Sequence, residues 1–91
     1  MPSVKIVVHG FVQGVGYRAY VKGVAESLGV SGKVRNMPDG SVEIIASANR
    51  EKLAEFEKRI VVSFKHGPDV LSIEEREAEE PISIAAGFEI I

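Results

Sequence analysis

The sequence predicts an α+β fold in which two helices lie on one face of an antiparallel β-sheet. Two stretches have apolar residues at helical spacing, and segments of alternating apolar and polar residues flank each of them. The turn Pro38-Asp39-Gly40 separates the two middle alternating segments by too few residues for a crossover helix. These segments are therefore expected to form a hairpin, and the whole chain a split β-α-β sandwich.

The first strand and the first helix are marked by their spacing. In the strand, Val4, Ile6 and Val8 alternate with polar residues, which predicts one buried face. The helix that follows has apolar residues at i, i+3, i+4 and i+7, with one more a turn earlier: Val21, Val24, Ala25 and Leu28, preceded by Tyr17. Gly29 is placed to end this helix.

The second and third strands are predicted on either side of the Pro38-Asp39-Gly40 turn. The inward positions of the second strand, residues 30–37, and of the third, residues 41–48, are Val30, Gly32, Val34 and Asn36, and Val42, Ile44 and Ala46. In the expected topology the first and third strands are central, and the second strand lies at an edge beside the third.

The second helix is predicted from Asn49, a favourable N-cap, with Glu51 in its first turn. Glu55 and Arg59 are spaced to form an i,i+4 ion pair. The expected inward stripe is Leu53, Phe56, Ile60 and Phe64. His66-Gly67-Pro68 is expected to end the helix.

The C-terminal part begins with a fourth strand at Val70–Ile73, which leads into the acidic stretch Glu74–Glu80. We expect this stretch to be a solvated sheet edge that discourages association between sheets, rather than a binding tail. Pro81 interrupts strand pairing, and Phe88, Ile90 and Ile91 provide a short closing strand. The order is β-α-β-β-α-β plus a short strand, which defines a ferredoxin-like sandwich.

The composition suits one globular domain, residues 1–91, with 45% hydrophobic and 26% charged residues. The absence of cysteine excludes thiolate metal sites and a cysteine nucleophile, and it fits a cytoplasmic protein, as does the absence of a signal-peptide pattern. No apolar run is long enough to span a membrane. The net charge of −2 argues against nucleic-acid binding. Its distribution is uneven, because residues 1–40 carry five basic and two acidic groups, a net +3.

The stretch with the strongest chemical signal is Gly10-Phe11-Val12-Gln13-Gly14-Val15-Gly16-Tyr17-Arg18, between the first strand and the first helix. Its glycines allow positive φ, and backbone N–H groups in such a turn, beside the free N–H groups of a helix start, form an anion cradle. Arg18 adds a planar guanidinium that suits a phosphate. We therefore predict a phosphate-binding loop whose arginine takes part in the chemistry.

Two nucleotide-binding patterns are excluded by context. Gly14–Ala19 matches G-x-G-x-x-A, but the following strands form a hairpin, and the only acid at the required distance is Asp39, in a turn. A P-loop needs a Gly-Lys-Ser/Thr sequence after its glycines, and none follows. An RNA-binding domain of this fold would need exposed aromatic residues on the central strands, where the sequence has none.

Asn36, at the end of the second strand, allows two interpretations. An inward asparagine at a strand end is commonly a local turn former or a hydrogen-bonded core amide. Because an amide both donates and accepts hydrogen bonds, Asn36 could instead orient a water molecule beside a bound phosphate. Its neighbour Arg35 has the opposite parity and is expected to be a surface charge.

The loop and several spaced motifs together resemble the acylphosphatase family. The resemblance spans nearly the whole chain and includes the specific element Val12-Gln13-Gly14-Val15-Gly16-Tyr17-Arg18. The other matching motifs are Gly32-x-Val34-x-Asn36, Asp39-Gly40-x-Val42-Glu43, Gly67-Pro68 and Phe88-x-Ile90.

The resemblance implies hydrolysis of an acyl phosphate to a carboxylate and inorganic phosphate, without metal, cofactor or covalent intermediate. In this sequence, the phosphate-binding backbone would come from Gln13, Gly14, Val15, Gly16, Tyr17 and Arg18. The catalytic residues would be Arg18, which holds the phosphate, and Asn36, which positions the attacking water. We expect a monomer that binds its small substrate but neither nucleic acid nor membrane.

The chain departs from the family pattern at two positions. Tyr17 replaces a frequent Phe, which requires a partner for its hydroxyl, and Lys33 stands where the family often has Trp. The competing hypothesis is a non-catalytic, ferredoxin-like module that binds a small molecule or regulates another protein. Such a module would have no reason to keep both Arg18 and Asn36.

Overall fold

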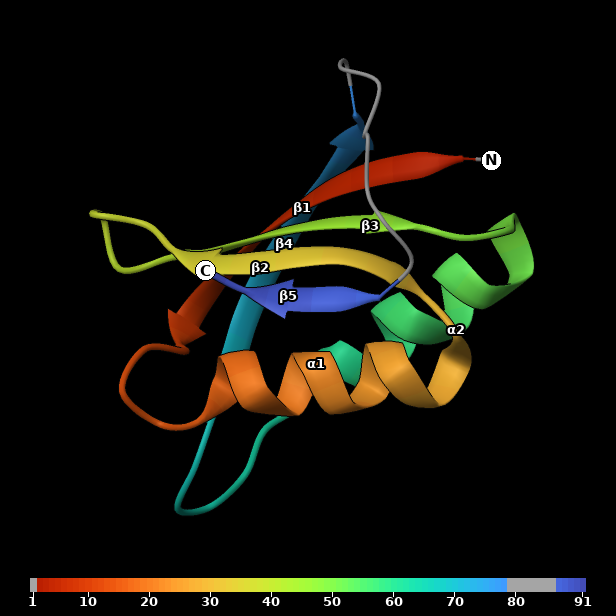
Figure 1. Cartoon of the computed structure of the whole chain (residues 1–91). Helices are drawn as coiled ribbons and strands as arrows, with labels where there is room; N and C mark the ends of the chain where they lie inside the picture. The colour runs from red at the N-terminus through yellow and green to blue at the C-terminus, as the bar shows by residue number, and fades with distance from the viewer. Residues whose placement is uncertain (1, 79–86) are drawn as a thin grey trace.

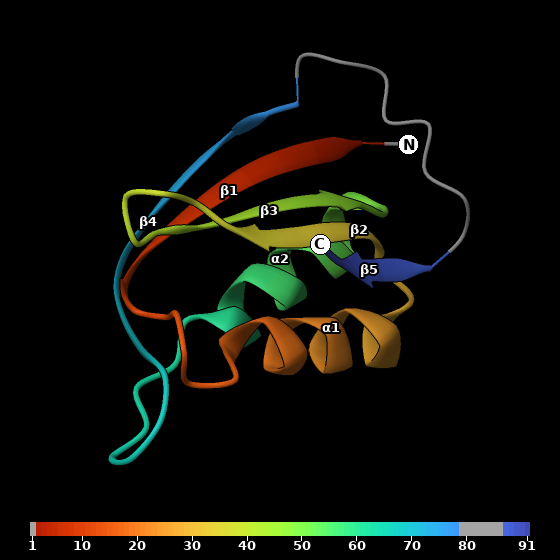
Figure 2. The same cartoon turned by 60° about the vertical axis from the view of Figure 1, so that its left-hand side comes forward.

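The structure is a computed structural model that describes residues 2–78 and 87–91. Its elements follow the predicted order and form a sheet with both helices on one face (Figures 1 and 2). They are β1 (Ser3–Phe11), α1 (Tyr17–Leu28), β2 (Ser31–Asn36), β3 (Val42–Ser47), α2 (Arg50–Ile60), β4 (Asp69–Glu77) and β5 (Phe88–Ile90). The predicted α+β, ferredoxin-like class is confirmed. The expected break at Pro81 lies outside the described residues.

The strand order in the sheet is β4-β1-β3-β2-β5. The β1–β3, β2–β3 and β1–β4 pairs are antiparallel, as predicted. The prediction that β2 lies at an edge is wrong, because β5 pairs parallel to it and makes the sheet mixed. β5 takes this place because Phe88 is buried, with its ring centroid 6.2 Å from that of Phe56. β4, which contains Glu74, Glu75 and Glu77 of the acidic stretch, forms the other edge, as expected, whereas Glu79 and Glu80 lie outside the described residues.

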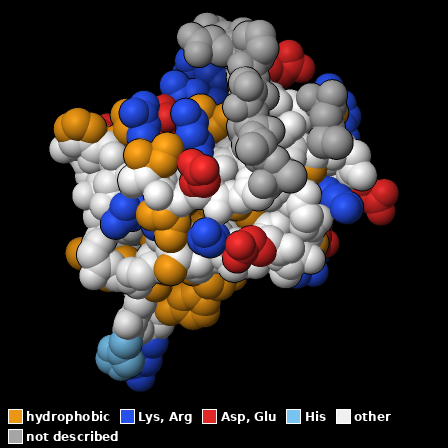
Figure 3. Space-filling model, viewed as in Figure 1, with side chains coloured by type: hydrophobic (Ala, Val, Ile, Leu, Met, Phe, Trp, Pro, Cys, Tyr) orange, Lys and Arg blue, Asp and Glu red, His pale blue; other side chains and the backbone are white. Residues whose placement is uncertain are grey.

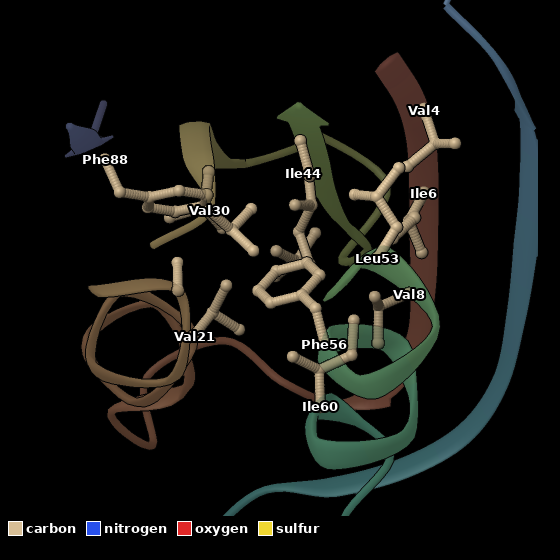
Figure 4. Close-up of a cluster of buried hydrophobic side chains, with 14 of the residues drawn as sticks. Val4, Ile6, Val8, Val21, Val30, Ile44, Leu53, Phe56, Ile60 and Phe88 are labelled. Carbon is tan, nitrogen blue, oxygen red and sulfur yellow. The ribbon is translucent and has the colours of Figure 1, made fainter. Parts of the chain in front are cut away.

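One hydrophobic core fills the space between the sheet and the two helices. Figure 4 shows side chains from β1, β3, α1 and α2 pointing toward one another, with Phe56 among them. The inward positions predicted for β3 and most of those predicted for the helices are buried: Val42, Ile44 and Ala46, and Tyr17, Val21, Ala25, Leu53, Phe56 and Ile60.

Three predicted features of the two helices are confirmed. Gly29 ends α1 in the left-handed conformation with φ of 72°, and the Asn49 side chain accepts a 2.8 Å hydrogen bond from the Lys52 N–H. On α2, the Arg59 Nε donates to a Glu55 carboxylate oxygen at 2.8 Å.

The predicted extension of α2 to Phe64 is wrong, since the helix ends at Ile60 and Phe64 is 47% exposed. Val61 adopts an extended conformation because the β-branched residues that follow α2 favour strands over helices. The chain then pairs with the start of β4, where the Val70 N–H donates to the Val62 carbonyl at 2.8 Å. Phe64 packs edge-on against Tyr20 instead, at 5.7 Å between centroids.

Two tyrosines of α1 bind the last carbonyl groups of α2. The Tyr17 hydroxyl donates to the Ile60 carbonyl at 2.8 Å in the buried core, and Tyr20 donates to Arg59 at 2.9 Å near the surface. Burial, and then the neighbouring Tyr20, raise the pKa of Tyr17, so its phenol stays a donor. The hydroxyl at this position thus finds the partner that its burial requires, and it joins the start of α1 to the end of α2.

Glu43 of β3 is a buried charge on the open face of the sheet, with a side chain that is 6% exposed. Its two carboxylate oxygens lie 2.9 Å from Arg35 Nε and 3.3 Å from Lys5 Nζ. Burial raises the pKa of Glu43, but hydrogen bonds from Arg35 and Lys5 outweigh it, and the net pKa is lowered. Arg35 is thus a structural charge that links β2 to β3. In the view of Figure 3, basic and acidic side chains are interspersed.

A carboxylate pair joins α2 to the acidic edge strand. Glu75 of β4 is paired with the inward-facing Ile6, and this register places Glu75 on the helix-covered face. Burial and the neighbouring Glu75 raise the pKa of Glu57 from 4.5 to about 7. The two acids therefore favour a protonated Glu57 in the folded protein.

The tyrosine contacts predict a graded loss of stability. Tyr17→Phe leaves the buried Ile60 carbonyl without its donor and should lower the free energy of unfolding by about 1–3 kcal/mol. Tyr20→Phe, the matched control, should cost less than about 1 kcal/mol because water can replace its more exposed bond. Urea unfolding at neutral pH measures both values. Equal losses, or a larger loss for Tyr20→Phe, would contradict this assignment.

The carboxylate pair predicts that stability falls as the pH rises. Between about pH 4.5 and 7 the folded protein keeps a proton on Glu57 that the unfolded chain releases, so ionisation costs stability above this range. Glu57→Gln and Glu75→Gln should each stabilise the protein at pH 8 but not at pH 4. Solvent screening keeps the gain below about 1 kcal/mol.

Unfolding at the two pH values, with the double variant included, checks this pair. Either substitution removes the same repulsion, and Glu57→Gln also removes the burial of an ionised carboxylate, so the double variant should gain no more than Glu57→Gln alone. A gain of the same size at pH 4 and pH 8 would show that the stabilisation does not come from the acid pair.

Candidate active site

The loop between β1 and α1 has the geometry of an anion-binding turn. Gly14 and Gly16 have φ of 74° and 78°, and Val15 between them has negative φ. Alternating signs of φ turn successive N–H groups toward the same side and form a concave backbone site. A Cβ at either glycine would meet no atom within 4 Å, so backbone conformation, not lack of space, requires glycine here.

The backbone donors of this loop are unused within the described chain. In residues 2–78 and 87–91, no N–H group from Gln13 to Ala19 donates a hydrogen bond to another protein atom. The N-cap of α1 is Gly16, which has no side-chain acceptor, and the first turn contains no acidic residue. The partial positive charge of the helix start is therefore left for an anion.

Apolar contacts hold this loop on the core. Val12 is buried at its start, Val15 is partly buried against the core, and Tyr17 is buried at its end. The polar backbone between them faces outward at Gly14 and Gly16, which are exposed. The loop thus presents its donors to solvent from a fixed base.

Arg18 lies on the first turn of α1 and is half-buried. Its Nη1 donates to the Ile91 carbonyl at 3.1 Å, and the Ile91 N–H donates to the Val34 carbonyl at 2.9 Å. This chain of contacts holds the guanidinium beside the last part of β2. One bond to Ile91 leaves the other donors of the five-donor fork for a ligand.

Asn36 is the last residue of β2 and is exposed. The register pairs it with Val42, so it keeps the parity of the inward positions but lies beyond the core. Its side chain makes no hydrogen bond within the described ranges, which argues against the turn-forming interpretation. No hydrogen bond joins Asn36 to Arg18 among these residues, although the Ile91 contacts bring their elements together.

The side chain of Gln13 has a role that the sequence did not indicate. Its Nε2 donates to the carbonyls of Met37 and Ser41, both at 2.8 Å, and so joins the loop to the turn that follows Asn36. The motif marked Gln13 as part of the loop, but only the folded contacts reveal its side-chain partners. The Ile91 carbonyl that holds Arg18 was missed for the same reason.

The charged groups near this turn support its shape. Hydrogen bonds from the Ser41 side chain and backbone lower the pKa of Asp39, which lies in the same turn. The Ser41 hydroxyl donates to Asp39 at 2.6 Å, and the Ser41 N–H donates at 2.9 Å. His9 is paired with Glu74 of β4 at 2.9 Å. Within the described part of the chain, no three His, Cys, Asp or Glu residues are grouped to hold a metal ion.

The fold and the loop define a class: an α+β sandwich with an anion-binding turn at the start of its first helix. The acylphosphatase family model matches residues 4–90. An acylphosphatase of Treponema denticola is 42% identical over 78 residues, 86% of this chain and 79% of that protein. One of Acaryochloris marina is 38% identical over 95 residues, 100% of this chain and 98% of that protein.

The structural comparison agrees. The crystal structure of acylphosphatase from Bacillus subtilis superimposes with a TM-score of 0.87 and 31% identity, over 100% of this chain and 99% of that one. The chain belongs to the acylphosphatase family. The enzyme class predicted from the sequence, a hydrolase that acts on acyl phosphates, is thereby confirmed. No helix of the described residues is long and apolar enough to cross a membrane.

Proposed function

We propose that this protein hydrolyses acyl phosphates with Arg18 and Asn36 as its catalytic residues. The observation that carries the proposal is the run of N–H groups from Gln13 to Ala19 that find no acceptor among the described residues, set beside an arginine and the end of β2. Gln13, Gly14, Val15, Gly16, Tyr17 and Arg18 together hold the phosphoryl group through their backbone donors. The physiological carboxylic acid is left open, because these donors recognise only the shared phosphate.

Phosphate binding follows from charge and geometry. The phosphoryl oxygens receive hydrogen bonds from the loop and from the guanidinium, which also neutralises charge as the bond to the leaving group lengthens. Backbone donors need no reorganisation during the reaction, and the buried Val12 and Tyr17 fix the two ends of the loop.

Asn36 positions the attacking water. Its exposed amide can accept a hydrogen bond from water through the oxygen and donate one through the nitrogen, so it fixes both place and orientation. The water oxygen bonds to phosphorus, the bond from phosphorus to the acyl oxygen breaks, and the carboxylate leaves with the electron pair. The proton of the water passes to a phosphate oxygen, which balances the products as carboxylate and inorganic phosphate.

Hydrolysis of an acyl phosphate needs little chemical activation by the protein. A carboxylate is already a good leaving group, so positioning and charge stabilisation suffice, without metal, cofactor or covalent intermediate. Neither Arg18 nor Asn36 acts as a base near neutral pH, and the substrate itself accepts the proton. We also propose that the protein is cytoplasmic and monomeric, that residues 1–91 form one domain, and that it binds neither nucleic acid nor membranes.

Substitution of the two catalytic residues separates binding from turnover. Arg18→Ala should lose phosphate binding and more than about 100-fold in kcat/KM, and Arg18→Lys should recover little, because ammonium cannot form a two-pronged contact. Asn36→Ala should keep its affinity for inorganic phosphate while kcat falls about 100-fold. Phosphate release from acetyl phosphate in the presence of a chelator measures turnover, and calorimetry measures phosphate binding.

The surface substitution Lys58→Ala, on the exposed side of α2, provides the control and should leave both quantities unchanged. Full activity of Asn36→Ala would remove the water-positioning role. Loss of wild-type activity on chelation would contradict the metal-free mechanism. A wild-type protein that binds phosphate but releases none from acyl phosphates would favour the alternative, a non-catalytic binding module.

The pH profile tests the route of the proton. Because the proposed mechanism uses no protein base, kcat should vary smoothly with the ionisation of the substrate and show no limb from a protein group. His9→Gln and His66→Gln should leave the profile unchanged. A limb that disappears in either variant would mean that a histidine, not the phosphate, accepts the proton.

A further inference from the structure

The Gln13 side chain uses its whole donor capacity on two carbonyl groups. Nε2 lies 2.8 Å from the Met37 oxygen and 2.8 Å from the Ser41 oxygen. An amide nitrogen has two hydrogens, so none is left for a phosphate. Since both partners are acceptors, only the NH₂ group can face them, which fixes the orientation of the amide. Gln13 can therefore contribute to phosphate binding through its backbone N–H, while its side chain serves another purpose.

The two carbonyls belong to the turn that begins directly after Asn36. The Ser41 carbonyl also accepts the Met37 N–H at 2.8 Å, and the Met37 carbonyl accepts the Gly40 N–H at 3.2 Å. The Gln13 amide thus donates to a carbonyl at each end of this turn. One of them, the Met37 carbonyl, belongs to the residue next to Asn36.

This contact is the hydrogen-bonded link between the two halves of the site. Within residues 2–78 and 87–91, no hydrogen bond other than the two from Gln13 joins residues 12–16 to residues 36–41. The pairing of β2 with β3 ends at Asn36 and Val42, and beyond it the bond from the Met37 N–H to the Ser41 carbonyl closes the turn. The direct contact between the phosphate loop and the turn after Asn36 consequently depends on Gln13.

We propose that Gln13 is a positioning residue, whose side chain sets the distance between the bound phosphoryl group and the water held by Asn36. This inference rests on the proposed function, because it gives Asn36 the water. Loss of the Gln13 donors shifts the turn against the loop, so the water is misplaced while the backbone donors remain. Turnover is therefore affected more strongly than phosphate binding.

Gln13→Met removes both donors at similar volume. It should lower kcat for acetyl phosphate by about 10- to 100-fold and change the dissociation constant of inorganic phosphate by less than about threefold. Ser27→Ala is the matched control, because it also removes a side-chain hydrogen bond to a backbone carbonyl, that of Val24 in α1, but leaves both bonds of the Gln13 amide in place. Its kcat should stay within about twofold of wild type.

A double variant distinguishes this inference from the proposed function. If Gln13 acts through Asn36, Gln13→Met should lower kcat little further in an Asn36→Ala background. Full additivity, or a Gln13→Met defect that lies mainly in phosphate binding, would overturn the positioning role while leaving Asn36 as the water-binding residue. An active Asn36→Ala protein would instead overturn the proposed function.

Gln13→Glu supplies a readout that a purely structural role would not produce, and it replaces Gln13→Met if the latter fails to fold. An ionised carboxylate facing two carbonyls has no hydrogen to donate, whereas the protonated acid can donate to one of them. The kcat of Gln13→Glu relative to wild type should therefore rise as the pH falls from about 8 to about 5. A ratio that stays constant over this range would contradict the proposal.

Discussion

The direction of three strands is the constraint on which the site depends. β1 and β2 are each antiparallel to β3, which lies between them, so they run in the same direction and end at the same side of the sheet. Val8 of β1 and Asn36 of β2 are both paired with Val42, which places their backbones about 10 Å apart. The loop that continues β1 and the asparagine that ends β2 are thereby neighbours, although 20 residues and a helix separate Gly16 from Asn36 along the chain.

The sheet brings these parts near one another, and side chains then determine how they meet. Gln13 closes the gap on the hairpin side, and the Ile91 carbonyl holds Arg18 on the β5 side. Glu43 stiffens the same three strands from the open face, where its bonds to Lys5 and Arg35 cross both strand pairs. Three sets of contacts therefore hold the site: those of Gln13 in the loop, of Ile91 after β5 and of Glu43 on the open face. Each set involves a strand that the β1–β3–β2 register aligns.

Much of this arrangement could be predicted from periodicity and local chemistry. The spacing of Val21, Ala25, Val42 and Ile44 marked the faces that are buried, and the glycines of the loop marked the turn with positive φ before α1. The predictions that were wrong concern features that contacts between distant segments determine. Phe64 continued a helical spacing, but strand pairing between Val62 and Val70 ended the helix earlier. Asn36 had the parity of a core residue, yet the core ends before it. The place of β5 and the partners of Gln13 depend on segments more than twenty residues apart, and no local pattern records them.

The proposed mechanism needs only an arginine and an asparagine as catalytic side chains, because the backbone of the loop supplies the other hydrogen-bond donors. In the proposed site the backbone N–H groups and the guanidinium act only as hydrogen-bond donors, so phosphate binding needs no protein group that accepts a proton. A loop that only bound phosphate would hold inorganic phosphate without catalysing a reaction. Turnover also requires a water at a fixed distance from phosphorus. In the proposed mechanism that distance is set by the end of β2 and by the Gln13 amide that joins it to the loop, so the second strand matters as much as the glycine loop does.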